Sequence, residues 1–265
     1  MDVTYILAAM NTLSRKQREM REREALFLDI AERLLHEGGH QALTMDRIAE
    51  LAEYSKGTVY QHFKCKEEVL INLCWRGLEV LGDLFERAAT FDGNGRERML
   101  ACLLAHRLYA GLHPLHFDMI NTVKAGGVKE KLSADSLQRH AERAQRVHAT
   151  IAGIVFAARQ RGELPDDPRL APMELVYGLW SLSFGGLTLQ TFDIDFAEMG
   201  VADPDRALEV LASCALDGVG WRPLSSEHDY ATSAARIASE LFADEFAALA
   251  SDDDTAIPPP TGKED

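Results

Sequence analysis

Apolar residues recur at helical spacing in the first well-patterned segment of the chain. They follow the i, i+3, i+4, i+7, i+8 order of a helix with one buried face: Phe27, Ile30, Ala31, Leu34 and Leu35. Gly38-Gly39 is expected to end this helix, because glycine tolerates the left-handed conformation that commonly closes one. The pattern therefore predicts a helix over residues 25–39.

Two shorter helices are predicted to follow, with a tight corner between them. The first has four apolar residues on one face: Met45, Ile48, Ala49 and Ala52. Thr44 can cap this helix and Ser55 can cap the next one, because a hydroxyl oxygen accepts a hydrogen bond from a free amide. Val59 and Phe63 stand four residues apart on the second helix and are expected to face inward.

The outward side of the second short helix carries hydrogen-bonding side chains of moderate length: Lys56, Thr58, Tyr60, Gln61 and His62. Side chains of this kind reach phosphates and base edges, whereas a merely solvated helix face carries generic charge. The pair of helices therefore indicates a helix-turn-helix whose second helix can enter a major groove.

The segment from Ser55 to Phe63, followed by Lys64-Cys65-Lys66-Glu67, resembles the signature of TetR-type transcriptional regulators. In that signature the recognition helix ends on Tyr-x-His-Phe and the next helix opens with Lys-Glu. Residues 25–39 are similar to the first helix of the family, and the resemblance covers roughly residues 20–80. It implies an all-α fold, with an N-terminal three-helix DNA-binding domain before a larger helical ligand-binding and dimerisation domain.

DNA contacts are expected around this helix-turn-helix. Helix amino termini attract anions, so Thr44 and Ser55 can add hydroxyls to phosphate contacts while they also act as plain caps. Lys56 suits guanine and the methyl group of Thr58 suits a thymine methyl, so we expect both to contact base edges. Gly57 has no side chain and lets the helix approach the groove, although it costs about 1 kcal/mol of helix propensity against alanine.

Further contacts are implied by the resemblance or are secondary. Phosphate contacts are expected from Tyr60, His62, Lys64 and Lys66, and secondary contacts from Arg47 and Gln61. Three positions depart from the family pattern. Glu53 stands at the corner where glycine is common, and would cost about 1–2 kcal/mol in a left-handed conformation. Tyr54 replaces a smaller apolar residue, and Cys65 replaces a better helix cap.

Net charge changes this picture only when it is divided by region. The chain of 265 residues has a formal charge of −14, which would repel DNA. Residues 15–76 carry 11 basic and 11 acidic side chains, however, and the other residues carry 17 and 31. Phosphate binding must therefore come from local cations, including the basic lead into the first helix at residues 15–23.

The rest of the chain reads as further helices without a convincing strand. Their expected ranges are 66–89, 97–112, 115–123, 133–162, 172–190, 204–216 and 226–249. We expect four regions: a flexible extension over 1–18, the DNA-binding domain over 19–66, the regulatory and dimerisation domain over 67–250, and a disordered acidic tail over 251–265.

The family resemblance implies a ligand cavity in the larger domain. Candidate lining residues are aromatic, polar or apolar: Trp75, Phe85, Leu103, His106, Tyr109, His113, Phe117, Asn121, His148, Phe156, Trp180 and Phe184. A histidine on an apolar stripe, such as His106 or His148, is also typical of an ordinary core residue. A mostly apolar pocket with a few polar groups would bind a hydrophobic or aromatic small molecule.

DNA-binding domains of this size usually recognise palindromic DNA sites as dimers. The candidate homodimer surface comprises Leu175–Leu189 and Ala207–Leu216, where Gly185-Gly186 would permit close helix approach. The alternative is that these helices only complete the core of one chain.

Other classes of function find little support. The chain lacks a Ser/His/Asp spacing, a phosphate loop and a helical Glu-x-x-His pair, so an enzyme is not expected, and no cofactor is predicted. A metal site at His113 and His116 is disfavoured by Pro114. The four cysteines lack zinc-ligand spacing and fit a reducing cytoplasm. No membrane span or signal peptide is expected.

The sequence therefore predicts a cytoplasmic, ligand-responsive regulator that binds operator DNA as a homodimer, in the manner of a repressor. A DNA-binding structural or nucleoid-associated protein of the same fold, with no small ligand, is the alternative.

Overall fold

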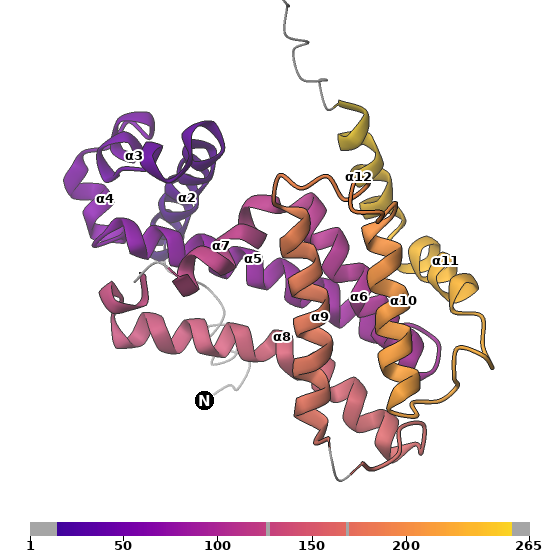
Figure 1. Ribbon diagram of the computed structural model, residues 1–265. Helices are drawn as coiled ribbons and strands as arrows, with labels where there is room; N and C mark the ends of the chain where they lie inside the picture. Colours follow the sequence, from indigo (N-terminus) through magenta and orange to yellow (C-terminus); the bar gives the residue numbers. More distant parts are fainter. Residues whose placement is uncertain (1–14, 126–127, 168–169, 256–265) are drawn as a thin grey trace, which may run out of the picture. The chain divides into compact units, whose positions relative to one another are not determined.

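The computed structural model describes residues 15–125, 128–167 and 170–255, and all regular elements within these ranges are helices (Figure 1). The one β-type contact described is an isolated bridge between Asp167 and Leu170. The predicted all-α fold is thereby confirmed. No helix in the described ranges combines the length and apolarity that crossing a bilayer requires.

The chain divides into two compact units, which are described separately. Unit 1 comprises the residues up to Trp75 together with Asp118–Leu137, and unit 2 comprises Arg76–Phe117 and the residues from Gln138 onward. Helix α5 (Lys66–Ala89) contributes residues to both units, as do α7 (Pro114–Ala125) and α8 (Ala134–Gln160).

Unit 1 is built around α2 (Arg15–Ala42), α3 (Met45–Leu51), α4 (Lys56–His62) and the start of α5. Its core consists of the apolar faces read from the sequence and is almost fully buried: Phe27, Ala31, Leu34, Ile48, Val59, Phe63 and Ile71. Its second stretch includes the short 3-10 helix η1 (Val128–Lys131), and Lys131 Nζ lies 2.7 Å from Glu67 Oε1 on α5.

Helix α2 is longer than the predicted 25–39. It starts at Arg15, so residues 15–18 belong to it and not to a flexible extension, while residues 1–14 lie outside the described ranges. The predicted glycine stop appears as a break, because Gly38 and Gly39 leave helical dihedral angles and Gly39 has φ of 61°. Beyond this break the chain is helical again as far as Ala42.

The corner between α3 and α4 has the geometry that its sequence indicated. Glu53 has φ of 57°, in the left-handed region where a non-glycine residue costs about 1–2 kcal/mol. Tyr54 packs edge-on against Phe27 with ring centroids 5.5 Å apart. An edge-to-face contact of this kind anchors the corner on the core of unit 1.

Unit 2 contains the rest of α5, α6 (Gly95–Leu112), most of α8, α9 (Pro172–Gln190), α10 (Pro204–Gly218), α11 (Tyr230–Leu241) and α12 (Ala243–Thr255). Helix α6 packs against α9, α10, α11 and α12. Its buried residues surround the helix, with Met99, Cys102, His106 and Tyr109 on one side and Ala101, Leu104 and Leu108 on the opposite side. A helix buried on several sides forms the core of its unit.

The segment expected to be a single helix over 226–249 is two helices, so that prediction was wrong. The first begins after the cap residue Asp229, and the chain leaves helical geometry at Phe242, with φ of −130° and ψ of 25°. The bend accompanies complete burial of the Phe242 ring, 4.8 Å below the Arg87 guanidinium. Helix α12 then includes residues 251–255, which were assigned to the tail, and residues 256–265 lie outside the described ranges.

One buried arginine connects the start of α6 with α10 and the segment before α11. Arg96 is 2% exposed, and its Nη1 lies 2.5 Å from Asp217 Oδ1. The same nitrogen donates to the carbonyl oxygens of Trp221, at 2.9 Å, and Pro223, at 2.8 Å. Its guanidinium also lies 4.5 Å from the ring centroid of Tyr230. These contacts fix the start of α6 to the end of α10 and the segment that follows it, at least 121 residues later in the chain.

Candidate functional site

The two short helices of unit 1 begin at side-chain caps. Thr44 Oγ1 accepts a hydrogen bond from the amide of Arg47 at 3.2 Å, and Ser55 Oγ accepts one from the amide of Thr58 at 3.1 Å. The hydroxyls of Ser55 and Thr58 are also hydrogen-bonded to each other at 2.8 Å. Both predicted phosphate-contact hydroxyls therefore lie at helix amino termini, where the amides and the helix dipole favour an anion.

The cation on the exposed side of α4 has an acidic neighbour on α3. Lys56 Nζ lies 2.6 Å from Asp46 Oδ2, and both side chains are more than half exposed. An exposed ion pair of this kind contributes little stability because water screens it. The pair does set where the ammonium group lies before any phosphate or base arrives.

Gly57 is exposed, and the fold does not require glycine there. A Cβ built at this position would meet nothing closer than Ser55 Oγ, at 3.7 Å, which is an ordinary contact. Tyr60, Gln61 and Lys64 are also exposed, and Tyr60 has 49% of its surface accessible. The exposed side of α4 is therefore thin at Gly57 and polar or aromatic beside it.

Replacing Gly57 with alanine should separate folding from DNA binding. We expect the variant to be more stable by up to about 1 kcal/mol, because alanine has the higher helix propensity. We expect operator affinity to fall about tenfold, because the added methyl group holds α4 away from the groove. Thermal unfolding and an anisotropy titration with operator DNA check the two effects. An unchanged affinity would show that close approach at Gly57 is unimportant.

Three predicted DNA-contact residues are engaged within unit 1. The His62 ring is half-buried and packs edge-on against Phe27, with centroids 5.2 Å apart, and burial lowers the pKa of its imidazole. Lys66 Nζ donates to the carbonyl oxygen of His40, and Arg47 Nη1 donates to that of Ala42 at 3.4 Å. His62 therefore faces the core, a placement that its position in the motif did not indicate.

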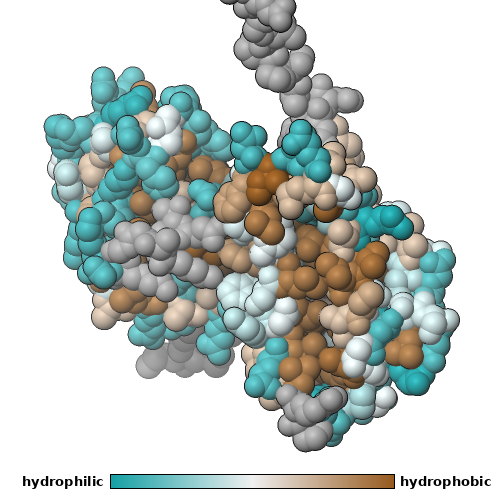
Figure 2. Space-filling view, in the orientation of Figure 1, coloured by the Kyte–Doolittle hydropathy of each residue, from teal (hydrophilic) through white to brown (hydrophobic). Residues whose placement is uncertain are grey.

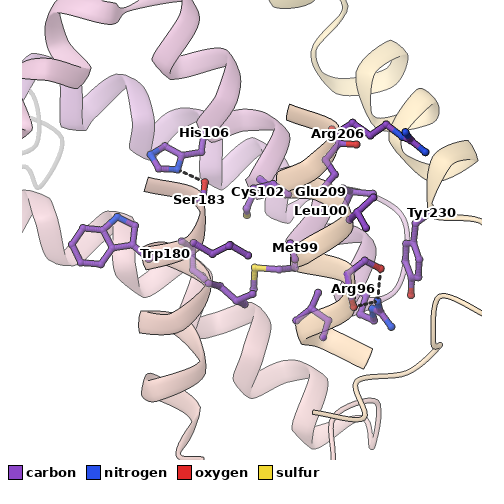
Figure 3. A pocket seen from close by; sticks show the side chains of 18 of the residues that line it. Arg96, Met99, Leu100, Cys102, His106, Trp180, Ser183, Arg206, Glu209 and Tyr230 are labelled. Carbon is purple, nitrogen blue, oxygen red and sulfur yellow. Dashed lines mark hydrogen bonds between the residues drawn. The ribbon is translucent and has the colours of Figure 1, made fainter. Parts of the chain in front are cut away.

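Unit 2 contains a cavity of about 300 Å³ between α6, α9, α10 and α11 (Figure 3). Four of the predicted ligand residues line it: Phe85, Leu103, His106 and Trp180. The main residues that the sequence analysis missed are Arg96, Met99, Leu100, Cys102, Ile151, Leu179, Leu182, Ser183, Arg206, Glu209, Val210, Ser213, Leu216 and Tyr230. The walls are mostly apolar, as ligand pockets generally are.

The remaining predicted ligand residues lie elsewhere. Phe117 and Phe184 pack around the His106 ring, with centroids 5.9 and 6.4 Å from it, and do not line the cavity. Tyr109 and His113 are also outside the lining, with ring centroids 5.8 Å apart. His148 packs edge-on against Trp180 at 5.4 Å.

Three further predicted ligand residues are also outside the cavity. Phe156 is 47% exposed. Trp75 and Asn121 belong to unit 1, where Trp75 is buried. The aromatic residues of the sequence therefore indicated a cluster near the cavity, but only some members of that cluster line the cavity wall.

One polar part of the cavity wall is a hydrogen-bonded histidine and serine. His106 Nδ1 lies 2.7 Å from Ser183 Oγ, and both residues are buried. Burial lowers the pKa of His106 to about 4, so the ring is neutral at pH 7. The sequence left open that His106 is an ordinary core residue. In the structure it is buried and hydrogen-bonded like a core residue, and it also lines the cavity.

Helices α9 and α10 carry large apolar side chains in the open. Tyr177 is 66% exposed, Leu211 is 54%, and Met173 and Val210 are each about half exposed. Figure 2 shows hydrophobic residues gathered over these two helices. We call Met173, Tyr177, Val210 and Leu211 the α9–α10 face. Monomeric proteins rarely expose large apolar patches, so this face is a candidate interface.

Close packing of α9 on α10 depends on Gly186. A Cβ at that position would overlap the side chain of Leu208, whereas one at Gly185 would meet nothing within 4 Å. Gly186 therefore serves the packing of the two helices within the chain. The inward sides of α9 and α10 therefore do complete the core of one chain, as the alternative holds. Their outward apolar residues stay exposed in the single chain.

No group of three or more His, Cys, Asp or Glu side chains that could hold a metal ion occurs in the described ranges. The four cysteines are free thiols, and burial raises the pKa of Cys102 to about 12.

Comparisons with known proteins agree on one family. The sequence model described as "Bacterial regulatory proteins, tetR family" matches residues 27–73. The transcriptional repressor KstR of Mycolicibacterium smegmatis is 31% identical over 94 residues, which are 36% of this chain and 45% of that protein. The match therefore spans less than half of the curated relative.

Solved structures extend the likeness to the helical fold. PfmR of Thermus thermophilus, a TetR-family regulator, has a TM-score of 0.52 at 19% identity, covering 70% of this chain and 94% of PfmR. AibR, solved with isovaleryl coenzyme A and operator DNA, has a TM-score of 0.52 at 16% identity, covering 72% of this chain and 97% of AibR. At these identities the likeness shows the fold alone.

Proposed function

The chain belongs to the TetR family of bacterial regulatory proteins, and from this premise we propose that it is a ligand-responsive repressor. It would bind palindromic operator DNA as a homodimer in the cytoplasm and release it when a hydrophobic or aromatic small molecule binds. The observation that carries the proposal is the exposed side of α4, with Lys56, Gly57 and Tyr60 beside the capped helix terminus at Ser55.

DNA recognition would use α4 in the major groove. Lys56 and Thr58 would approach base edges, while the amino termini of α3 and α4 and the side chains of Tyr60, Gln61 and Lys64 would contact phosphates. Arg47, His62 and Lys66 would contribute mainly by holding the unit together. Of these three, Arg47 is exposed, whereas His62 and Lys66 are partly buried.

The dimer would form through the α9–α10 face. A two-fold axis brings the same patch of each copy together, so exposed apolar residues on two packed helices can cover one another. The proposed homodimer would then present two copies of α4 to successive major grooves.

Effector binding would act through α5. Phe85, near the carboxyl end of α5, lines the cavity of unit 2, and Lys66 at its start is part of unit 1. A ligand shifts the balance between two forms only by its difference in affinity for them. AibR, whose solved structure holds a small molecule and operator DNA, offers a precedent in the same fold.

The test is an anisotropy titration of the full chain with DNA from its own promoter region at low salt. Lys56→Ala is expected to weaken binding about tenfold, because a good base contact is worth about 1–3 kcal/mol. Asp46→Asn is the matched variant, and it is expected to tighten binding because it removes the carboxylate beside the same ammonium group. Unchanged affinity in Lys56→Ala would refute the placement of Lys56, and no binding by the unaltered chain would refute the proposed function.

The structural or nucleoid-associated alternative predicts tight DNA binding that no small molecule affects. The cavity of unit 2 favours the ligand-responsive form of the proposal, because a packed structural domain has no need of an apolar cavity of about 300 Å³.

A further inference from the structure

We propose that the cavity of unit 2 binds an uncharged, lipophilic molecule with one hydrogen-bonding oxygen, an alcohol or a ketone, held at the His106–Ser183 pair. This inference rests on the proposed function in taking the cavity as the effector site. It goes further in naming the chemical class of the ligand and the residues that select it.

The apolar walls favour a lipophilic ligand. Apolar side chains on five of the lining helices face the space, with Phe85 from α5, Met99 and Leu103 from α6, Ile151 from α8, Leu179 and Leu182 from α9, and Leu216 from α10. Burying a ligand against such walls removes apolar surface from water on both sides. The volume of about 300 Å³ is at the lower end for small-molecule pockets, so the ligand is compact.

The charged groups at the cavity are already engaged or face outward. Arg96 is bound by Asp217 and two backbone carbonyls. Glu209 lies 3.7 Å from Arg107, and burial raises the pKa of its carboxyl. Arg206 is exposed, and Figure 3 shows its guanidinium directed away from Met99 and His106.

A charged head group at the His106–Ser183 pair would therefore find no countercharge beside it, because Arg96 and Glu209 have partners and Arg206 is directed away from that pair. A carboxylate or ammonium group that enters an apolar space loses its hydration, and only a free partner of opposite charge offsets that loss. Fatty acids and alkylamines in their charged forms are accordingly not the preferred ligands of the cavity.

The His106–Ser183 pair suits a neutral oxygen in either role. A serine hydroxyl has one donor and two acceptor sites, and neutral imidazole can donate or accept at Nδ1, depending on its tautomer. When Ser183 donates to Nδ1, its lone pairs can accept from an alcohol. When Nδ1 donates to Ser183, the hydroxyl hydrogen can turn to a ketone oxygen. One pair thereby recognises both oxygen types without any charge.

The experiment uses four ten-carbon probes that differ only in the head group: 1-decanol, 2-decanone, decanoate and decylammonium. Binding to the full chain is measured by calorimetry at pH 7.5, below the solubility limit of the alcohol and the ketone and below the micellar concentration of the two ions. The alcohol and the ketone are expected to bind at least tenfold more tightly than either ion. Equal or tighter binding of decanoate or decylammonium would overturn the proposal.

Ser183→Ala tests the residue assignment. It is expected to lower decanol and decanone affinity about tenfold and to leave the weak binding of the two ions unchanged. Ser181→Ala, at an exposed position of the same helix, is the matched control and is expected to change nothing. Thermal unfolding confirms that both variants fold, and His106→Asn provides a second variant that should also lose the preference. Retained selectivity in both Ser183→Ala and His106→Asn would overturn the assignment.

The pH dependence adds an independent readout. Because burial lowers the pKa of His106 to about 4, its ring stays neutral between pH 7.5 and about 5.5, and decanol affinity is expected to be constant there. A steep loss of decanol binding over that range would count against the neutral pair.

The same preparations are titrated with operator DNA, so that the ligand class and the DNA-binding function are tested separately. Operator binding with no selectivity for the neutral probes would overturn the ligand class and leave the DNA-binding proposal standing. Selective probe binding with no operator binding would support the ligand class and refute the proposed function.

Discussion

Replacing Arg96 with alanine is expected to lower the free energy of unfolding of unit 2 by about 3–5 kcal/mol. The side chain is nearly inaccessible and binds Asp217, two backbone carbonyls and Ser213. Its removal takes one donor away from each of these acceptors and opens a void below the Tyr230 ring, while Asp217 keeps its hydrogen bonds from Ser225 and Pro223 keeps one from Tyr230. These losses are costly because the Arg96 side chain itself is almost fully buried, so little water can replace its hydrogen bonds.

Chemical denaturation followed by tryptophan fluorescence measures this effect, since Trp221 lies next to the arginine and is fully buried. Arg222→Ala is the matched control. That arginine pairs with Glu227 at 2.5 Å, but it is largely exposed, so a loss of less than about 1 kcal/mol is expected. A similar loss of unfolding free energy in the two variants would show that the burial of Arg96 does not determine its contribution to stability.

The Arg96 cluster also gives stability a dependence on pH. Burial disfavours the ionised Asp217, but hydrogen bonds from Ser225 and Arg96 outweigh it and hold the pKa below its ordinary value. A carboxyl with a lowered pKa in the folded state stabilises the fold above its unfolded pKa, and that contribution disappears as the pH falls through the folded pKa. The loss with falling pH should be smaller in Arg96→Ala.

Replacing Leu211 with glutamate is expected to convert the proposed dimer into a monomer and to lower operator affinity at least a hundredfold. The side chain is 54% exposed in the single chain, so the substitution leaves the core intact while it places a charge in the α9–α10 face. A monomer also loses the second half-site, and linked binding of two sites typically contributes about 10²–10⁴-fold.

Sedimentation velocity and operator titration together check this prediction. Met199→Glu is the matched control, because Met199 is 69% exposed but lies in the segment between α9 and α10 and not on either helix. It is expected to remain dimeric. A dimeric Leu211→Glu protein with normal operator affinity would exclude the α9–α10 face as the interface.

The helix-turn-helix could be predicted from the sequence because its determinants are local. Thr44 and Ser55 cap the helices that follow them immediately, and Glu53 adopts the left-handed conformation at the position where glycine is common. His62 is the exception within the motif. Its ring contacts Phe27, 35 residues earlier in the chain, and spacing within α4 could not indicate that contact.

The cavity could be predicted only in part because it depends on contacts between distant segments. His106 and Ser183 are 77 residues apart, and Arg96 and Asp217 are 121 apart. Periodicity shows which side of a helix is buried but not which neighbour covers it. The walls from α10 and α11 were therefore missed, and the bend at Phe242 was read as continuous helix because the residues on both sides are good helix formers.

The ion pair between Lys56 and Asp46 has a consequence for how the protein would search a chromosome. On DNA of random sequence, a phosphate must displace the Asp46 carboxylate before it can pair with Lys56. Each non-specific encounter therefore gains less binding free energy than it would from an unpaired lysine. Short residence on irrelevant DNA leaves more molecules free to find their true target. The Asp46 carboxylate beside α4 would thus speed the search for the operator while it weakens each contact of Lys56 with DNA.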